Sequence, residues 1–263
     1  LVIESSVIGL EIIYEHRSYL PSIGFFLLLV LLAFRTGLPR RVLVAGFCLL
    51  AALWSVWTIE RNAVWVDPQT FWLDVVAKSP GMLRPYYALG IIHINNDRHE
   101  EAEDWFTRAI NVHDRFKKTS RSKAQPTRLT TLDWIQANAY YRRGTLRLER
   151  EALSEAGEDF SAAIRISDRK IVKAYFYRGI VNQKQGNDQA ALKDYSSMIK
   201  YYPRYYDTWH YRGDLHYKLK KYTAAARNYR KMTEMRPDDP VAHRKLGHSL
   251  MKLGDDEAAR QTL

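Results

Sequence analysis

A regular spacing of glycine and alanine constrains the fold of this chain more than any other feature of its sequence. Glycines recur at intervals of 54, 35, 34 and 34 residues, at Gly90, Gly144, Gly179, Gly213 and Gly247. An alanine follows each glycine by twelve residues, and in the first four copies a Phe or Tyr follows that alanine by four. Such a period indicates stacked repeats, because one short unit cannot bury its own apolar face.

The other positions of the period resemble the tetratricopeptide repeat (TPR), whose pattern is W-x2-L-G-x2-Y, then A-x3-F, then P. A large ring precedes the glycine by four residues in most copies, and Pro203 and Pro237 close the third and fourth copies. The resemblance covers residues 83–263. It implies an all-α solenoid of about five repeats, each made of two antiparallel helices whose backbones cross closely at Gly and Ala.

Two departures modify this pattern. Arg178 and Arg212 replace the leucine before glycine, and Met198 and Met232 replace a small residue, which predicts looser helix packing in these copies. An insertion over residues 114–133 separates the first two copies. It is basic, polar and contains proline, so we expect a mobile surface loop.

Residues 62–82, just before the first repeat, predict a linker and one further helix. Asp67 and Pro68 suit the N-cap and first turn of that helix. Trp72 and Val75 fall in register with the second helix of a repeat. We therefore expect a half repeat that caps the open face of the array.

Two uncharged runs, at residues 19–34 and 42–59, predict a transmembrane helical hairpin within residues 19–61. As helices they reach ~24 and ~27 Å, close to the ~30 Å hydrocarbon core of a bilayer. A pair of buried helices in a soluble core would show a polar stripe, and neither run has one. A signal peptide would need a small-residue cleavage site, which is absent between the runs.

The connecting loop, residues 35–41, predicts the orientation of the hairpin. It contains Arg35, Arg40 and Arg41 and no acid, and short arginine-rich loops stay in the cytosol. Residues 1–18 and the repeats are then extracytoplasmic. The chain starts with Leu1 and stops within a repeat, so we expect it to be part of a longer protein.

Composition and motifs give no sign of catalysis. The formal charge of +11 is spread along the repeats without an arginine stripe, which favours a solvated surface over nucleic-acid binding. Cys48 is the single cysteine, so no disulfide framework or thiolate metal site is expected. Phosphate-loop, zinc-protease and nucleophile-elbow motifs are absent, and we expect no cofactor.

The surface with functional potential is the concave face of the array, which TPR proteins line with the first helix of each repeat. Tyrosines and basic residues there suit an extended peptide or a glycan chain, since rings offer rigid contact area and bases pair with carboxylates. The Lys/Asn carboxylate clamp of chaperone-binding TPR domains is absent, because Tyr and Phe occupy the positions of its lysine. The residues on this face are Tyr87, Tyr141, Arg142, Lys173, Phe176, Tyr177, Gln183, His210, Tyr211, Asp214, Tyr217, Arg244, Lys245 and His248.

The segment YEHRSYLPSIGF, before the first hydrophobic run, has its own family resemblance. With the preceding IESSVIGLE it resembles bacterial polytopic membrane proteins with a TPR tail, and is similar to the TMTC-type transmembrane mannosyltransferases of the GT-C class. That class implies transfer of sugars from lipid carriers on the extracytoplasmic face. Its catalytic acid would lie upstream of Leu1. His16 and Arg17 are expected at headgroup depth, as anchors or as ligands of an anionic lipid.

Two functions therefore remain open. The first is a membrane-anchored TPR scaffold that binds a protein or polymer partner, with its array in the periplasm of a bacterium. The second is the C-terminal part of a lipid-linked-sugar glycosyltransferase whose array presents the acceptor, so the sequence leaves enzyme activity undecided. A nucleic-acid binder would require a cytosolic array.

Overall fold

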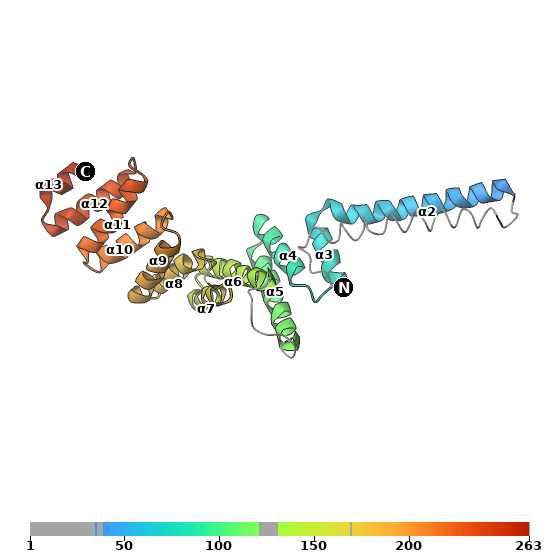
Figure 1. Ribbon diagram of the computed structural model, residues 1–263, viewed down its shortest axis with the longest axis horizontal. Helices are drawn as coiled ribbons and strands as arrows, with labels where there is room; N and C mark the ends of the chain where they lie inside the picture. The colour runs from blue at the N-terminus through green and yellow to red at the C-terminus, as the bar shows by residue number, and fades with distance from the viewer. Residues whose placement is uncertain (1–34, 36–38, 121–130, 169, 263) are drawn as a thin grey trace. The chain divides into compact units, whose positions relative to one another are not determined.

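The computed structural model describes residues 35, 39–120, 131–168 and 170–262, and all secondary structure in these residues is helical (Figure 1). The chain divides into two units, residues 1–67 and 68–263. The all-α prediction is therefore confirmed. The first expected span, residues 19–34, lies outside the described residues, as do His16 and Arg17.

The first unit contains the long helix α2, Arg40–Val66. Its stretch Arg40–Ile59 has a mean hydropathy of 2.2 and none of it is buried, and it is the one described helix long and apolar enough to cross a membrane. Two hydroxyls inside it are satisfied within the helix: Ser55 donates to the carbonyl of Ala51 and Thr58 to that of Trp54, both at 2.8 Å. Such internal bonding is what hydrocarbon requires of polar groups.

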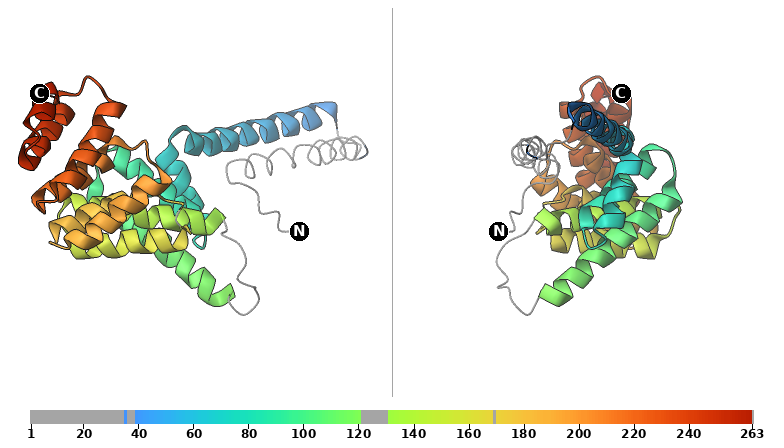
Figure 2. Two further views of the ribbon diagram at one scale, coloured as in Figure 1. Left: turned by 60° about the vertical axis from the view of Figure 1, so that its left-hand side comes forward. Right: turned by 90° about the vertical axis from the view of Figure 1, so that its right-hand side faces the viewer.

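The second unit is a stack of helix pairs (Figures 1 and 2). After α3 the pairs are α4 with α5, α6 with α7, α8 with α9, α10 with α11, and α12 with α13, and the second helix of each pair also contacts the first helix of the next. The predicted solenoid is thus present. The bounds are α3 Pro68–Lys78, α4 Leu83–Asn95, α5 His99–Ser120, α6 Thr131–Glu149, α7 Leu153–Ile166, α8 Lys173–Lys184, α9 Asp188–Tyr201, α10 Tyr206–Lys218, α11 Tyr222–Met235, α12 Pro240–Leu253 and α13 Asp256–Thr262.

Helix α3 lies beside the first repeat. It begins at Pro68, and its Val75 is buried. Contacts join α3 to α4, and the guanidinium of Arg98 donates to the side-chain oxygen of Gln69 at 2.7 Å. These contacts attach α3 to the first repeat, and its role as a capping half repeat stays a prediction.

The repeat glycines face aromatic rings rather than a neighbouring backbone. A Cβ placed on Gly90, Gly179 or Gly213 would lie 2.5–2.7 Å from a ring sixteen residues further along. These rings come from the Phe or Tyr of the A-x3-F segment, and each is almost fully buried. The sequence located the close approach correctly but assigned the wrong partner. The glycine–ring pairs are Gly90 with Phe106, Gly144 with Phe160, Gly179 with Tyr195 and Gly213 with Tyr229.

At the arginine-containing repeats, where we expected looser packing, hydrogen bonds take the place of the leucine contact. Arg178 donates from Nε and Nη2 to the carboxylate of Asp194 at 3.0 and 2.7 Å, and from Nη1 to the hydroxyl of Ser161 in the preceding repeat at 3.1 Å. Met198 and Met232 are buried. The arginine thus joins both helices of its own repeat to the repeat before it.

The same pattern recurs in the neighbouring repeats. Arg143 pairs with Asp159 and donates to Thr107. Arg212 donates to Asn228 and Ser196. We call Arg143, Arg178 and Arg212, with these partners, the arginine ladder. In each rung the acceptor in the arginine's own repeat lies sixteen residues downstream.

The inserted segment is shorter than the sequence indicates. We expected a loop over residues 114–133, but α5 continues to Ser120 and α6 begins at Thr131. Polar side chains hold the two helices together there. Lys117 lies 2.5 Å from a carboxylate oxygen of Asp133, and Gln136 donates to Asp114 at 2.6 Å. Because these bonds satisfy the polar side chains locally, the helical backbone continues into the polar sequence. Residues 121–130 lie outside the described part of the chain.

Candidate functional site

Side chains on α6, α8 and α10 form a continuous set of ring contacts on the face that the sequence selects. Tyr141 lies 5.8 Å from Tyr177, centroid to centroid, and Tyr177 lies 5.3 Å from Phe176. Phe176 in turn lies 5.3 Å from Tyr211 and 5.2 Å from Tyr205, the residue that caps α10. We call these five residues the aromatic strip.

Members of the strip differ in how much surface they offer. Phe176 is buried in the core of the middle repeats and supports the other rings rather than a partner. Tyr141, Tyr177 and Tyr205 are partly exposed, and Tyr211 is exposed. Burial, followed by the neighbouring Tyr177, raises the pKa of the Tyr141 phenol. This phenol therefore stays neutral and can act as a hydrogen-bond donor.

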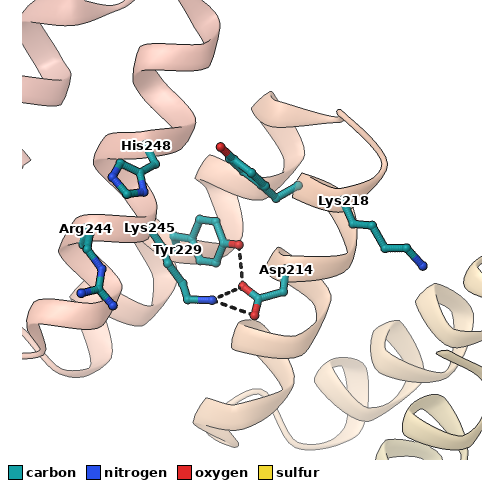
Figure 3. Close-up of a pocket in the computed structure, with 7 residues that line it drawn as sticks. Asp214, Lys218, Tyr229, Arg244, Lys245 and His248 are labelled. Atoms are coloured by element: carbon teal, nitrogen blue, oxygen red, sulfur yellow. Dashed lines mark hydrogen bonds and ion pairs between the residues drawn. The ribbon is translucent and has the colours of Figure 1, made fainter. Parts of the chain in front are cut away.

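A cavity of about 350 Å³ lies between α10, α11 and α12 (Figure 3). Five of the residues that the sequence places on the concave face line it: Asp214, Tyr217, Arg244, Lys245 and His248. Others lie apart from it: Tyr87 packs against Phe106 in the first repeat at 5.7 Å. The complete lining is Asp214, Tyr217, Lys218, Tyr229, Arg244, Lys245 and His248.

Asp214 organises this cavity. Its carboxylate accepts hydrogen bonds from the ammonium of Lys245 at 2.5 and 2.7 Å and from the hydroxyl of Tyr229 at 2.7 Å. His210 Nε2 lies 3.1 Å from Oδ2 of Asp214, the carboxylate oxygen that Tyr229 does not contact. Figure 3 shows Lys245 and Tyr229 directed at this carboxylate. Burial acts to raise the pKa of Asp214, but the bonds from His210, Lys245 and Tyr229 outweigh it and hold the pKa well below its usual range.

The sequence included Asp214 on this face but gave it no role, and it missed Tyr229 altogether. A signal was present: the residue after the repeat glycine is Ile91, Thr145, Ile180 or His248 in the other copies. Asp214 is the one acid at that position, next to a helix carrying Arg244 and Lys245. Tyr229 was missed because the A-x3-F position assigns it to the core, where its ring does lie.

The remaining basic groups around the cavity differ in their partners. Lys218 lies 3.1 Å from Asp188. Arg244 and His248 are exposed and make no hydrogen bond or ion pair with any residue that the structure describes. Among the described residues, no group of three or more His, Cys, Asp or Glu side chains could hold a metal ion.

Comparison with known families agrees with this fold. Family models described as "TPR repeat" match residues 213–254, and models described as "Tetratricopeptide repeat" match residues 83–112 and 173–205. The chain is a TPR protein. It is similar to TMTC-type proteins: it is 32% identical over 103 residues to protein O-mannosyl-transferase Tmtc2 of Drosophila melanogaster. The match covers 38% of this chain and only 11% of that relative.

Several solved structures superpose on this fold. YrrB, described as a TPR protein with an unusual peptide-binding site, superposes with a TM-score of 0.58 at 16% identity and covers 73% of this chain and 88% of its own. MamA gives a TM-score of 0.55 at 15% identity and covers 68% and 87%. MamA of Desulfovibrio magneticus RS-1 gives 0.54 at 13%, covering 68% and 90%. At these identities the likeness shows the fold alone.

Proposed function

We propose that this chain is a membrane-anchored TPR scaffold that binds a protein partner as an extended peptide along α6, α8, α10 and α12. The observation that carries this proposal is the aromatic strip and its continuation into the cavity at Asp214. His210 makes that connection, since it pairs with Asp214 and its ring lies 5.9 Å from Tyr211.

Physical properties of the strip favour a peptide. Tyrosine rings offer a large contact area and lose little conformational entropy on binding, because they have only two rotatable side-chain bonds. The buried Phe176 and the contacts between rings hold Tyr177 and Tyr211 in place before a partner arrives. Pre-organisation of this kind lowers the cost of association. The peptide-binding site described for YrrB, which has the same fold, lends support to such a role.

The proposal can be tested by selecting ligands for the full chain held in lipid nanodiscs. A displayed library of random octapeptides should yield binders. Replacement of Tyr177 or Tyr211 by Ala should weaken binding of the selected peptides about tenfold, or about 1.4 kcal/mol, the upper part of the range for an aromatic pair. Tyr201→Ala is the matched control, because Tyr201 is exposed but stacks on Tyr175, outside the strip. Failure to recover any binder would contradict peptide binding.

The likeness to Tmtc2 favours a second candidate function. In that case the chain is the C-terminal portion of a GT-C-type glycosyltransferase that uses a lipid-linked sugar, and the array presents the acceptor polypeptide. The longer protein that contains this chain would transfer a sugar from a polyprenyl-phosphate carrier to acceptor peptides. Tyr177→Ala should then raise KM for the acceptor more than it lowers kcat. The absence of transfer by that longer protein would leave the scaffold function.

The membrane placement is part of the same proposal. The length and hydropathy of α2, together with the arginines at residues 35, 40 and 41, support a span whose repeats lie on the extracytoplasmic side, which is the periplasm in a bacterial inner membrane. His16 and Arg17 remain proposed contacts for lipid headgroups.

A further inference from the structure

We propose that Arg212 and Arg227 form a binding site for one phosphate group at the junction of the third and fourth repeats. Arg212 lies on α10, and Arg227 lies on α11, the second helix of the same repeat. The site is independent of the proposed peptide binding. Arg212 is bonded to the second helices α9 and α11, whereas first helices line the concave face.

The third rung of the arginine ladder lacks the carboxylate that the other two rungs contain. In the first two rungs, Nε and Nη2 of the arginine both donate to a buried aspartate, Asp159 or Asp194, at 2.7–3.0 Å. In the third rung the acceptor is the buried, neutral amide of Asn228. The positive charge of Arg212 is therefore not balanced by any acid among the residues that the structure describes.

The amide of Asn228 also leaves one donor group of Arg212 unused. Its oxygen accepts from Nε of Arg212 at 2.8 Å, and its nitrogen donates to the carbonyl of Ala224 at 2.6 Å. These two bonds fix the orientation of the amide, because an arginine cannot accept and a carbonyl cannot donate. Its nitrogen thus replaces the oxygen that accepts from Nη2 in the other rungs. Within the described part of the chain, Nη2 of Arg212 has no hydrogen-bond acceptor.

The guanidinium of Arg212 is held in place before a ligand arrives. Besides its bond to Asn228, Nη1 donates to the hydroxyl of Ser196 at 3.2 Å, and the guanidinium carbon lies 5.0 Å from the ring centroid of Trp209. The hydroxyl of Ser196 is itself fixed, since it donates to the carbonyl of Leu192 at 2.7 Å. Arg212 is partly exposed, so a ligand from solvent can reach Nη2.

Arg227 supplies a second positive charge at this place. It directly precedes Asn228, is exposed, and makes no hydrogen bond or ion pair with any residue whose structure is described. Burial, and then the positive charge of Arg227, lower the pKa of the Arg212 guanidinium. An anion bound by both arginines would remove their repulsion and would balance the charge of the partly buried Arg212.

The charge and the donors at the site favour phosphate over a carboxylate. Two guanidinium groups provide two positive charges and forked N–H donors that suit several oxygens at once. A phosphate group carries a charge of about −1.5 to −2 at neutral pH and at least three strong acceptor oxygens. A carboxylate carries a single charge and two oxygens. We therefore expect phosphate to take the place that a buried aspartate has in the first two rungs.

The experiment measures thermal unfolding of the full chain in a maltoside detergent, which contains no phosphate. Inorganic phosphate replaces chloride at constant ionic strength and stays in the low millimolar range, where its general effect on protein stability is small. The unfolding midpoint of the wild type should rise by about 3–6 °C at a phosphate concentration about tenfold above Kd.

Asn228→Asp is the decisive variant, because it supplies the missing carboxylate at nearly unchanged size. The third rung then matches the first two, and the rise with phosphate should disappear. Arg227→Ala gives a second test at an exposed residue whose removal leaves the core intact. It should raise the phosphate concentration needed for half of the effect about tenfold, the low end for a charge-assisted hydrogen bond.

Lys193→Ala is the matched control. Lys193 is exposed and occupies the position of Arg227 one repeat earlier, fourteen residues after the repeat glycine, where Asp194 already balances Arg178. This variant should respond to phosphate as the wild type does. A loss of the response in Lys193→Ala equal to that in Arg227→Ala would show a general effect of surface charge and would overturn the site.

Two further outcomes would also overturn the proposal: a wild-type midpoint that phosphate does not change, and a rise that persists in Asn228→Asp. A parallel titration with dihexanoyl phosphatidic acid separates the two sources of the group. If this lipid acts at a concentration at least about tenfold lower than phosphate, and only in proteins with Asn228, the site receives a lipid headgroup. An equal response to both compounds supports the site as one for free phosphate.

Discussion

At Gly179 the absence of a Cβ lets the ring of Tyr195 lie directly against helix α8. An added Cβ would sit 2.6 Å from Cε1 of that ring. The ring cannot swing away, because it is fully buried and its hydroxyl donates to Gln183 at 2.8 Å. Single positions of this kind determine how closely the two helices of a repeat can pack.

Gly179→Ala should therefore destabilise the array. Overpacking costs about 1–3 kcal/mol and the gain in helix propensity returns about 1 kcal/mol, so we expect a net loss of up to about 2 kcal/mol in denaturant unfolding. Gly157→Ala is the matched control. Its Cβ would lie 3.4 Å from Val181, an ordinary contact, so it should stabilise the array by up to about 1 kcal/mol. Equal effects would refute the role of the ring.

His216 provides a residue-scale prediction about pH. Burial, and then the nearby Arg212 and Lys221, lower the pKa of His216 below its ordinary value of 6.5. The unfolded chain therefore binds a proton more readily than the folded array, and stability should fall as the pH drops below about 6.5.

His216→Leu should reduce this loss, because Leu250 occupies the same place in the last repeat, three residues after its glycine. Thermal unfolding of both proteins between pH 8 and pH 5.5 measures the effect. As the pH falls, the unfolding midpoint of the wild type should drop by more than the midpoint of the variant. Parallel curves would show that His216 does not contribute. His113, whose pKa burial also lowers, accounts for a residual dependence in the variant.

At the scale of the helical element, each arginine of the ladder binds an acceptor within its own repeat and a hydroxyl of the preceding repeat. Its rungs use the position that most TPR sequences give to leucine, as at Leu89 and Leu246 in the terminal copies. Asp194 is buried and also accepts from Asn182 at 2.9 Å. Removal of Arg178 would therefore leave a buried carboxylate without its cation.

Arg178→Leu should destabilise the array by about 2–3 kcal/mol, less than the 3–5 kcal/mol of a fully buried pair because Arg178 is partly exposed. The double variant with Asp194→Ala should recover part of this loss, with a coupling energy of about 1–3 kcal/mol in a double-mutant cycle. Arg165→Leu, at an exposed arginine, should change stability by less than about 0.5 kcal/mol. Strict additivity of Arg178→Leu and Asp194→Ala would contradict the pairing.

At the scale of the whole molecule, the distribution of charge around the apolar segments predicts which side of the membrane carries the repeats. Alkaline phosphatase fused after Leu263 should be active in a bacterial host, and green fluorescent protein at the same place should be dark, because short arginine-rich loops generally stay in the cytosol. Fusions after Thr36, in that loop, should give the reverse result. Fluorescence from the Leu263 fusion would contradict the proposed orientation.

The sequence by itself determined the repeat architecture. The period set the number of helix pairs, and the Gly and A-x3-F positions located each close approach, because contacts within a repeat are local and recur with the sequence. The face that carries Tyr141, Tyr177, Arg244 and Lys245 could be chosen in advance for the same reason. The ends of α5 and α6 could not, since their polar residues gave no apolar period and bonds such as Lys117 to Asp133 hold them in the helix.

The tertiary structure decided what the individual residues do. The arginines that replace leucine become bridges only when a buried carboxylate or amide lies within reach. Asp214 becomes the centre of a cavity only when α11 and α12 bring Tyr229 and Lys245 to it. The physical reason is that a repeat specifies equivalent positions, whereas a site depends on the few residues that differ among them. Only the stacking of the repeats brings these differing residues into contact with one another.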